Sequence, residues 1–206
     1  MQTHEVKNYF DYLYTKKLDL DLAVLFASCR DMYGFIEQTI KTLDLPANVN
    51  PLGDEAPETA KLYGAYNLFL YPLPGFHELF KEIKLAYRTF SDDEGPAYIR
   101  SWLNVYYNGG TRDWHTHFDV CDNPWHGTFC VFTEPDSHTE YTIQDVDDTV
   151  KIDSYDNMLL IGKSKGNAHR VSEWTNPDIP RITISFDILP VADCKPFYDI
   201  NHWIPL

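Results

Sequence analysis

The chain has 206 residues, a hydrophobic content of 44% and a formal net charge of −14 at pH 7. This length and composition suit one folded domain with its own core and exclude a disordered polypeptide. The negative charge argues against nucleic acid and anionic lipid as partners, because their phosphates bind lysine and arginine, and no apolar run approaches the roughly 20 residues of a membrane span.

The first half of the chain is expected to hold one strand and two helices. Residues 5–18 mix β-forming side chains with charges and predict a first strand. Apolar residues recur at helical spacing over 22–43, directly after Asp21, a residue type that caps helix N-termini. A second apolar stripe predicts a helix over 75–90, and the proline-containing stretch 46–60 between the helices predicts a loop.

From Tyr98 onward, short β-rich runs separated by turn residues replace the helical patterns. About eight short strands at this spacing favour a β-sandwich or jelly roll over alternating strands and helices. The expected fold class is therefore α+β but mainly β, with at least two N-terminal helices supporting a sandwich in a single domain of residues 1–206. Within it we expect a strand-and-helix support over 1–95, a β core over 96–190 and a C-terminal tail over 191–206. The expected strands of the β core are 98–107, 114–119, 127–133, 139–144, 149–152, 157–161, 167–171 and 180–189.

Residues 113–119 place His115, His117 and Asp119 at every second position. In an extended strand these side chains share one face, because successive residues point to opposite sides. Two histidines and a carboxylate on one face suit a divalent transition metal and are typical of non-heme Fe(II) oxygenases. His169, which follows an apolar strand, is the best candidate for a further ligand, since the second and seventh strands of a double-stranded barrel lie side by side.

The last predicted strand alternates strictly between apolar and polar residues from Arg181 to Ile188. One interpretation is a sheet edge whose polar face lies in water. In the other, Arg181 and Thr183 point into the barrel and bind a carboxylate, because a guanidinium pairs with it bidentately and a hydroxyl adds a donor. The strand by itself leaves both interpretations open.

The ordered set His117-x-Asp119, His169 and Arg181-x-Thr183 resembles the Fe(II)- and 2-oxoglutarate-dependent dioxygenases. The strand and glycine loop at 102–110 are similar to those of the prolyl-hydroxylase-like branch. The strand at 126–132 is similar to that of small oxygenases of bacteria and phages. The resemblance covers residues 98–189.

The resemblance implies a double-stranded β-helix, or jelly roll, that holds Fe(II) through His117, Asp119 and His169. In the small oxygenases the ligand strand often reads His-x-His, and this chain offers that pattern as well in His115-x-His117. The alternative ligand set is therefore His115, His117 and His169, with Asp119 accepting a hydrogen bond behind them. A carboxylate ligand lowers the positive charge at the iron and is usual in the superfamily, so the resemblance favours the set with Asp119.

The resemblance also implies that Arg181, with Thr183, binds the distal carboxylate of the cosubstrate 2-oxoglutarate. Tyr107 and Asn104, on the strand ahead of the histidines, are candidates to lie beside the cosubstrate. The expected reaction hydroxylates a C–H bond of a peptidyl or small amino-acid-like substrate with O2, releasing succinate and CO2, with ascorbate as a reductant.

Two other functions compete with this one. A cupin-type protein would bind a metal and catalyse different chemistry, but an inward arginine such as Arg181 needs a carboxylate partner. A non-catalytic jelly-roll module would hold a sugar or peptide with its aromatic residues, but it needs no ordered metal ligands. For the oxygenase we expect a small-molecule or peptide substrate, no nucleic acid or membrane partner, and the cytoplasm as compartment (that of the host cell for a phage protein). The oligomeric state is left open, a homodimer included.

Overall fold

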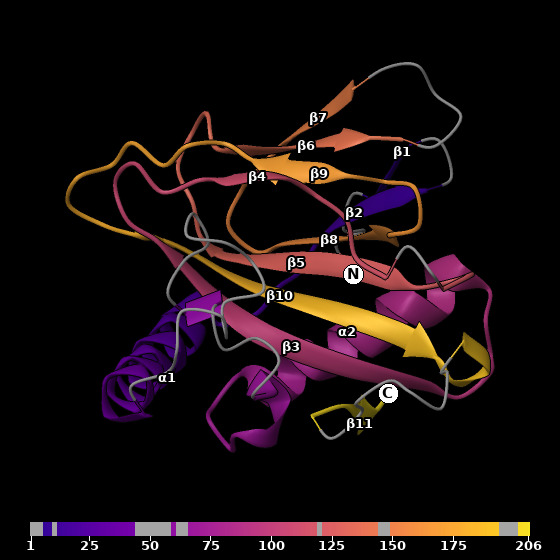
Figure 1. The fold of residues 1–206 in the computed structure, drawn as a ribbon, viewed down its shortest axis with the longest axis horizontal. Coiled ribbons are helices and arrows are strands. Elements are labelled where there is room, and N and C mark those ends of the chain that lie inside the picture. The colour runs from indigo at the N-terminus through magenta and orange to yellow at the C-terminus, as the bar shows by residue number, and fades with distance from the viewer. Residues whose placement is uncertain are drawn as a thin grey trace.

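The chain folds as a mainly β structure with two antiparallel sheets and two α-helices (Figure 1). The computed structural model describes residues 6–9, 12–43, 59–60, 66–118, 121–143, 149–193 and 202–206. Within these ranges, no helix is long and apolar enough to cross a bilayer.

The larger sheet has seven strands in the order β1-β2-β8-β5-β10-β3-β11, and the smaller sheet has four in the order β4-β9-β6-β7. Every pair of neighbouring strands in both sheets is antiparallel. The strands of the larger sheet are β1 Val6–Tyr9, β2 Leu13–Lys17, β3 Ala97–Tyr106, β5 Trp125–Phe132, β8 Met158–Lys163, β10 Arg181–Pro190 and β11 Ile204–Pro205. Those of the smaller sheet are β4 Arg112–His115, β6 His138–Thr142, β7 Thr149–Asp153 and β9 His169–Val171.

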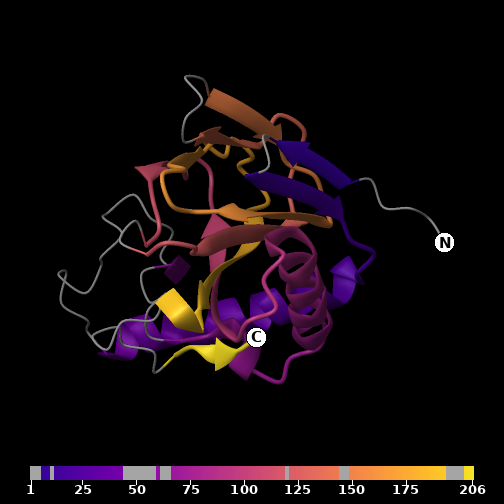
Figure 2. The same ribbon diagram turned by 90° about the vertical axis from the view of Figure 1, so that its right-hand side faces the viewer.

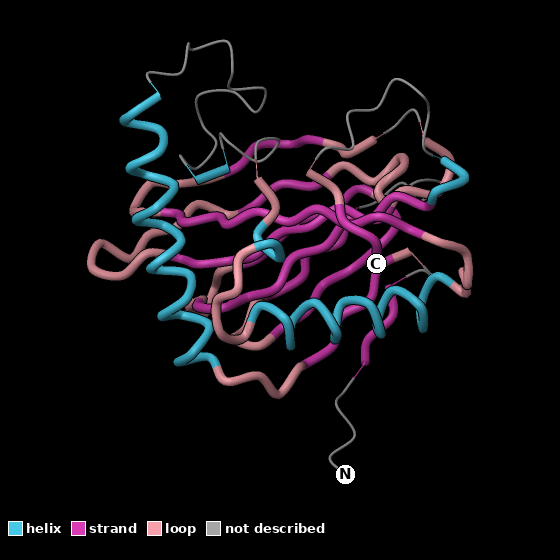
Figure 3. Tube along the Cα trace, turned by 90° about the horizontal axis from the view of Figure 1, so that it is seen from below, coloured by secondary structure: helices cyan, strands magenta, loops and turns pink. Residues whose placement is uncertain are grey.

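The helices and the two sheets form three layers, with the larger sheet in the middle (Figure 2). Helices α1, Leu22–Leu43, and α2, Phe76–Ser91, run across one face of the larger sheet, as the view from below shows (Figure 3). The smaller sheet covers the opposite face (Figure 2). Two short 3-10 helices, Leu68–Leu70 and Val191–Asp193, complete the described elements.

Both helices form where the sequence predicts them. The Asp21 carboxylate accepts hydrogen bonds from the backbone N–H groups of Ala23 and Val24, both at 3.1 Å, which satisfies donors that the first turn leaves open. Helix α2 buries one stripe of side chains against the sheet: Phe76, Leu79, Ile83, Ala86 and Tyr87.

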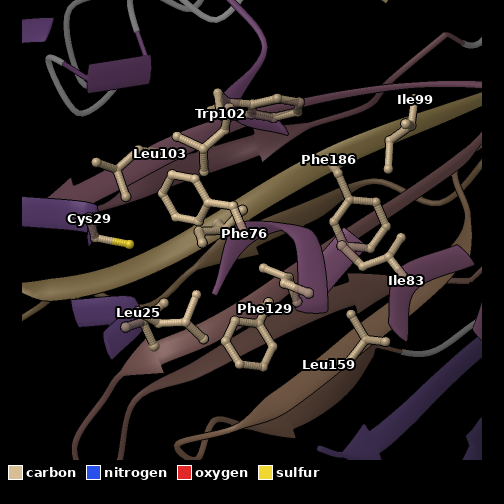
Figure 4. Packing of buried hydrophobic residues seen from close by; sticks show 14 of the residues in the cluster. Leu25, Cys29, Phe76, Ile83, Ile99, Trp102, Leu103, Phe129, Leu159 and Phe186 are labelled. Atoms are coloured by element: carbon tan, nitrogen blue, oxygen red, sulfur yellow. The ribbon is translucent and has the colours of Figure 1, made fainter. Parts of the chain in front are cut away.

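The main hydrophobic core lies between the helices and the larger sheet. Figure 4 shows side chains of both helices interleaved with those of the central strands, among them Phe129 of β5 and Phe186 of β10, neither of which is exposed. The even-numbered residues of β3 and the odd-numbered residues of β10 point to the other face, because side chains alternate along a strand. The polar residues on that face lie between the two sheets and build the site described below.

The structure corrects three expectations about the strands. The expected strand over 5–18 is a hairpin of β1 and β2, in which Tyr9 pairs with Leu13. The expected strand over 114–119 ends at His115, so strand alternation does not extend to His117. The interpretation of 181–188 as a sheet edge in water is wrong, because β10 lies between β5 and β3 and all its residues are buried.

Two glycines give opposite expectations for stability. A Cβ atom at Gly127, in β5, would overlap the Phe186 ring and lie 2.5 Å from the Leu160 carbonyl oxygen. Gly127→Ala should therefore lower the free energy of unfolding by about 1–3 kcal/mol, the usual cost of overpacking. Gly34 is exposed within α1 and has no neighbouring atom within 4 Å of such a Cβ.

Gly34→Ala is the matched substitution and should raise the free energy of unfolding by about 1 kcal/mol, because alanine loses less backbone entropy in a helix. Urea unfolding of the two variants beside the parent chain measures both changes. Equal effects of the two substitutions would contradict the close packing of β5 against β10.

Candidate functional site

Three histidines meet where the smaller sheet faces the larger one. His115 ends β4 and His169 begins β9, and the register of these two strands places the residues directly opposite each other. Their ring centroids are 4.2 Å apart, and those of His117 lie 5.2 Å from His115 and 5.3 Å from His169. One ring nitrogen from each histidine lies within 4.8 Å of those of the other two. The second and seventh strands of the β core thus lie side by side, as expected.

The chain turns sharply after the second of these histidines. Phe118 has a φ of 56°, in the left-handed region that non-glycine residues rarely adopt. His117 itself lies in a bend two residues beyond the end of β4, and the ring of Trp102 stacks near it with centroids 6.0 Å apart. His117 and His169 are buried, with 9% and 5% of their surfaces exposed.

The protonation of these residues suits metal binding. Burial lowers the pKa of His115 to about 4 and that of His169 well below its usual range, so both rings are neutral at pH 7 and keep a lone pair. The buried Nε2 of His117 has no hydrogen-bond partner in the part of the chain that the structure describes. Three clustered imidazoles, one with an unused nitrogen, fit a divalent transition metal.

A buried carboxylate lies behind the histidine cluster. Asp187 of β10 is not exposed, and its Oδ1 is 3.1 Å from His117 Nδ1 and 2.9 Å from His126 Nδ1. Its Oδ2 accepts hydrogen bonds from Arg100 Nε and Nη2 at 3.0 and 2.9 Å. Burial alone would raise the pKa of Asp187, but attraction to His117 and Arg100 and the hydrogen bonds to the histidines hold it well below its usual range. Burial also lowers the pKa of His126 to about 4.

A buried cation lies at the other end of the same strand face. Arg181 is 2% exposed, and its Nη2 donates to Ser154 Oγ at 3.3 Å. Among the described residues, its Nε and Nη1 have no hydrogen-bond partner. The guanidinium carbon lies 5.8 Å from the centroid of the Tyr106 ring. A buried guanidinium with two unsatisfied nitrogens is unfavourable unless an anion binds there.

Neutral polar groups lie between the two ends. Asn104 Nδ2 donates to Ser185 Oγ at 2.8 Å and approaches Thr183 Oγ1 at 3.4 Å. One cavity, with about 50 Å³ of room inside it, connects these groups with the histidine cluster and with Arg181. Its described lining includes four histidines and two arginines but no carboxylate, although the chain as a whole is strongly acidic.

The structure brings most of the predicted site residues into this cavity: His117, His169, Arg181, Thr183 and Asn104. Asp119 lies outside the described residues, so its role as a ligand stays a prediction. The expectation for Tyr107 is wrong, because its side chain is 54% exposed and its ring lies 6.3 Å from that of Tyr33. Its neighbour Tyr106, which pairs with Arg181 in the sheet register, lines the cavity instead.

The sequence patterns did not single out Asp187 or Arg100 as site residues. The signal was present, because Asp187 is the fourth polar residue on the β10 face that begins with Arg181. The register of the sheet pairs Asp187 with Arg100 on β3 and with His126 on β5. Because the sequence predicts strands but not their register, the proximity of these three residues could not be predicted.

No protein-family model matches the sequence, and no curated protein matches it either. Among solved structures, AviO1 from Streptomyces viridochromogenes Tue57 is similar, with a TM-score of 0.59 and 13% identity over 90% of this chain and 92% of that one. A prolyl-4-hydroxylase from Pseudomonas putida has a TM-score of 0.51 and 11% identity over 95% of this chain and 90% of its own. The nickel complex of the non-heme monooxygenase ThoJ has a TM-score of 0.50 and 12% identity over 83% of this chain and 70% of its own.

At these identities the likeness concerns the fold. The prolyl-4-hydroxylase aligns with nearly the whole length of both chains. This agrees with the family that the motifs resemble, which was inferred from the sequence alone. The chain therefore shares its fold with AviO1 and with this prolyl-4-hydroxylase.

Proposed function

We propose that this chain is a non-heme Fe(II)- and 2-oxoglutarate-dependent oxygenase that hydroxylates a peptidyl or small amino-acid-like substrate. The observation that carries the proposal is a single cavity with three clustered histidines at one end and the unsatisfied guanidinium of Arg181 at the other. A metal and a dicarboxylate are the two groups that would satisfy these ends together.

The strand order supports a double-stranded β-helix as the scaffold. Counted from β3 as the first strand of the β core, the four central strands of the larger sheet run 1-8-3-6. The smaller sheet runs 2-7-4-5 in the same count. Two four-stranded sheets with this alternation form a jelly roll, whose interior holds a ligand between the sheets.

His115, His117 and His169 would hold the metal. They are the described histidines whose ring nitrogens converge at the cavity, and the low pKa values of His115 and His169 keep those rings neutral. Iron bound there would supply the activation of O2 that couples decarboxylation of 2-oxoglutarate to oxidation of the substrate. Because Asp119 is outside the described residues, the ligand set with Asp119 is tested separately below.

Arg181 would bind the far carboxylate of 2-oxoglutarate. Its Nε and Nη1 have no hydrogen-bond partner among the described residues, so the guanidinium keeps N–H groups that can donate to a carboxylate. Thr183, two residues along the same face of β10, offers a hydroxyl to the same anion. Asn104 fixes the neighbouring Ser185 hydroxyl, which leaves the polar face of β10 ordered before the cosubstrate binds.

Aromatic rings would keep water out of the cavity. Trp102, Tyr106 and Tyr141 line it, and each has less than 7% of its surface exposed. The Tyr141 ring lies 5.1 Å from that of His169, on the side of the smaller sheet. A dry, closed cavity strengthens the attraction between Arg181 and a bound carboxylate, because the local dielectric constant is low.

Succinate formation from 2-oxoglutarate tests the proposal most directly. The purified chain with Fe(II), ascorbate and O2 should convert 2-oxoglutarate to succinate slowly without substrate, and EDTA should abolish the conversion. Calorimetry under anaerobic conditions should show 2-oxoglutarate binding that depends on added Fe(II) or Mn(II). A chain that binds the metal but not 2-oxoglutarate would favour a cupin-type protein, and one that binds neither would favour a binding module.

A further inference from the structure

The buried carboxylate of the site does not lie in the group formed by His115, His117 and His169. Asp187 contacts His117 from the side opposite its unpaired nitrogen: Nδ1 lies 3.1 Å from Asp187 Oδ1, whereas the buried Nε2 has no partner among the described residues. Since an ionised carboxylate only accepts hydrogen bonds, Nδ1 is the nitrogen that donates to Asp187, and Nε2 is the one left to face a metal.

Asp187 is also fixed in place on its other sides. His126 donates to the same Oδ1 at 2.9 Å, and Arg100 donates twice to Oδ2 at 2.9 and 3.0 Å. The Asp187 side chain is fully buried, and that of Arg100 is 12% exposed. Two side chains from two strands, β5 and β3, thus hold the carboxylate in place behind His117.

We propose that Asp187 is a positioning residue that orients His117 as a metal ligand and supplies, through that ring, the negative charge that a metal-bound carboxylate supplies elsewhere. A carboxylate hydrogen-bonded to a ligating histidine fixes the ring and makes it a stronger donor. In this arrangement three histidines bind the metal directly, and the Asp187 carboxylate acts on it through the His117 ring. This inference rests on the proposed metal site, and it extends that site to β10.

A second metal position is the alternative use of the same atoms. His117, His126 and Asp187 also bring potential ligand atoms within 4.8 Å of one another. Arg100, however, places its positive charge 2.9 Å from Asp187 Oδ2, where it would repel a divalent cation. Both histidine Nδ1 atoms already lie at hydrogen-bonding distance from Asp187. These atoms therefore form a supporting network, and we expect one metal per chain.

Asp187→Asn tests the proposal, with Co(II) as a spectroscopic probe in place of Fe(II). The substitution keeps the size and an acceptor oxygen but removes the charge behind His117. Affinity for Co(II) should fall roughly 10- to 100-fold, as is usual when a partner of a ligating histidine is lost. The visible absorption spectrum of bound Co(II) should shift, because the ring becomes a weaker donor. The parent chain should bind one equivalent of Co(II).

Asp193→Asn is the matched control. Asp193 is another buried aspartate, 7% exposed, and it accepts the backbone N–H of Asn123 at 2.8 Å. This variant should lose stability and keep both the Co(II) affinity and the spectrum. The double variant Arg100→Gln, Asp187→Asn removes both buried charges together and so avoids an unpaired one. It should show the same loss of Co(II) affinity as Asp187→Asn.

The outcomes separate this inference from the proposed function. Wild-type affinity and spectrum in both Asp187 variants would overturn the positioning role while the metal site stands. Two equivalents of Co(II) in the parent chain would overturn it in favour of the second metal position. A parent chain that binds no Co(II), Mn(II) or Fe(II) would overturn the inference and the proposed function together.

Discussion

Arg181→Met is expected to abolish tight binding of 2-oxoglutarate without destabilising the fold. Removing one partner of a buried, hydrogen-bonded charge pair costs about 2–5 kcal/mol, so the affinity should fall roughly 30-fold to several thousand-fold. Without the cosubstrate, Arg181 is a buried cation, two of whose nitrogens have no hydrogen-bond partner in the described segments. An apolar residue of similar volume in its place should leave the free energy of unfolding unchanged or raise it.

Arg100→Met is the matched substitution with the opposite expectation for stability. Arg100 is the only arginine that the described residues place against Asp187, with two hydrogen bonds to a carboxylate that is not exposed. Its removal leaves that carboxylate short of its cation and should lower the free energy of unfolding by about 3–5 kcal/mol.

Thermal or urea unfolding compares the stability of the two arginine variants. Calorimetric titration of 2-oxoglutarate into each Mn(II)-loaded chain compares their affinity for the cosubstrate. Similar destabilisation by both substitutions would mean that Arg181 has a structural partner. Unchanged 2-oxoglutarate affinity in Arg181→Met would rule out Arg181 as the carboxylate anchor.

The helices and strands of this fold are largely predictable, because the apolar spacing, caps and turn residues that define each one lie within its own segment. Helix α1 has the predicted bounds, since the Asp21 cap and the apolar spacing lie within the segment itself. The eight strands expected after residue 98 all have counterparts, because turn residues separate them in the sequence. The hairpin of β1 and β2 was missed because both strands carry similar residues and no glycine marks the turn.

The site is less predictable, because it depends on strand register and on a bend. Alternation along 113–119 suggested that His115, His117 and Asp119 share a face, but β4 ends at His115. The left-handed conformation of Phe118 then redirects the chain, and a phenylalanine gives no sign of this in the sequence. Alternation on β10 succeeded for Arg181 and Thr183, because both residues lie within the strand and the strand lies between β5 and β3 in the sheet.

The second large effect is the loss of metal affinity when a ligand is substituted. If His115, His117 and His169 hold the metal, His115→Ala should weaken Fe(II) or Co(II) binding by about 100-fold or more. Binding of a structural metal by four ligands is worth about 10–16 kcal/mol, so each ligand contributes about 2.5–4 kcal/mol. Asp119→Ala should then cost less affinity than His115→Ala, because it removes no ligand and at most a hydrogen-bond partner of one.

His138→Ala is the control for removing a histidine from the smaller sheet. His138 lies on β6, and its Nε2 is 3.2 Å from Glu140 Oε1, outside the metal-binding groups of the described chain. This variant should bind the metal as the parent chain does. Metal titrations of the three variants, followed by the absorption of bound Co(II), compare them under the same conditions.

The opposite pattern would restore the ligand set with a carboxylate. Loss of binding in Asp119→Ala with full binding in His115→Ala would make Asp119 a ligand and His115 a neighbour of His169. The charge argument for Asp187 then weakens, because a carboxylate at the metal already lowers its positive charge. If three histidines are the ligands, Asp187 is the nearest buried carboxylate in the described structure. The ligand substitutions and the Asp187→Asn variant together therefore decide which carboxylate supplies negative charge to the metal centre.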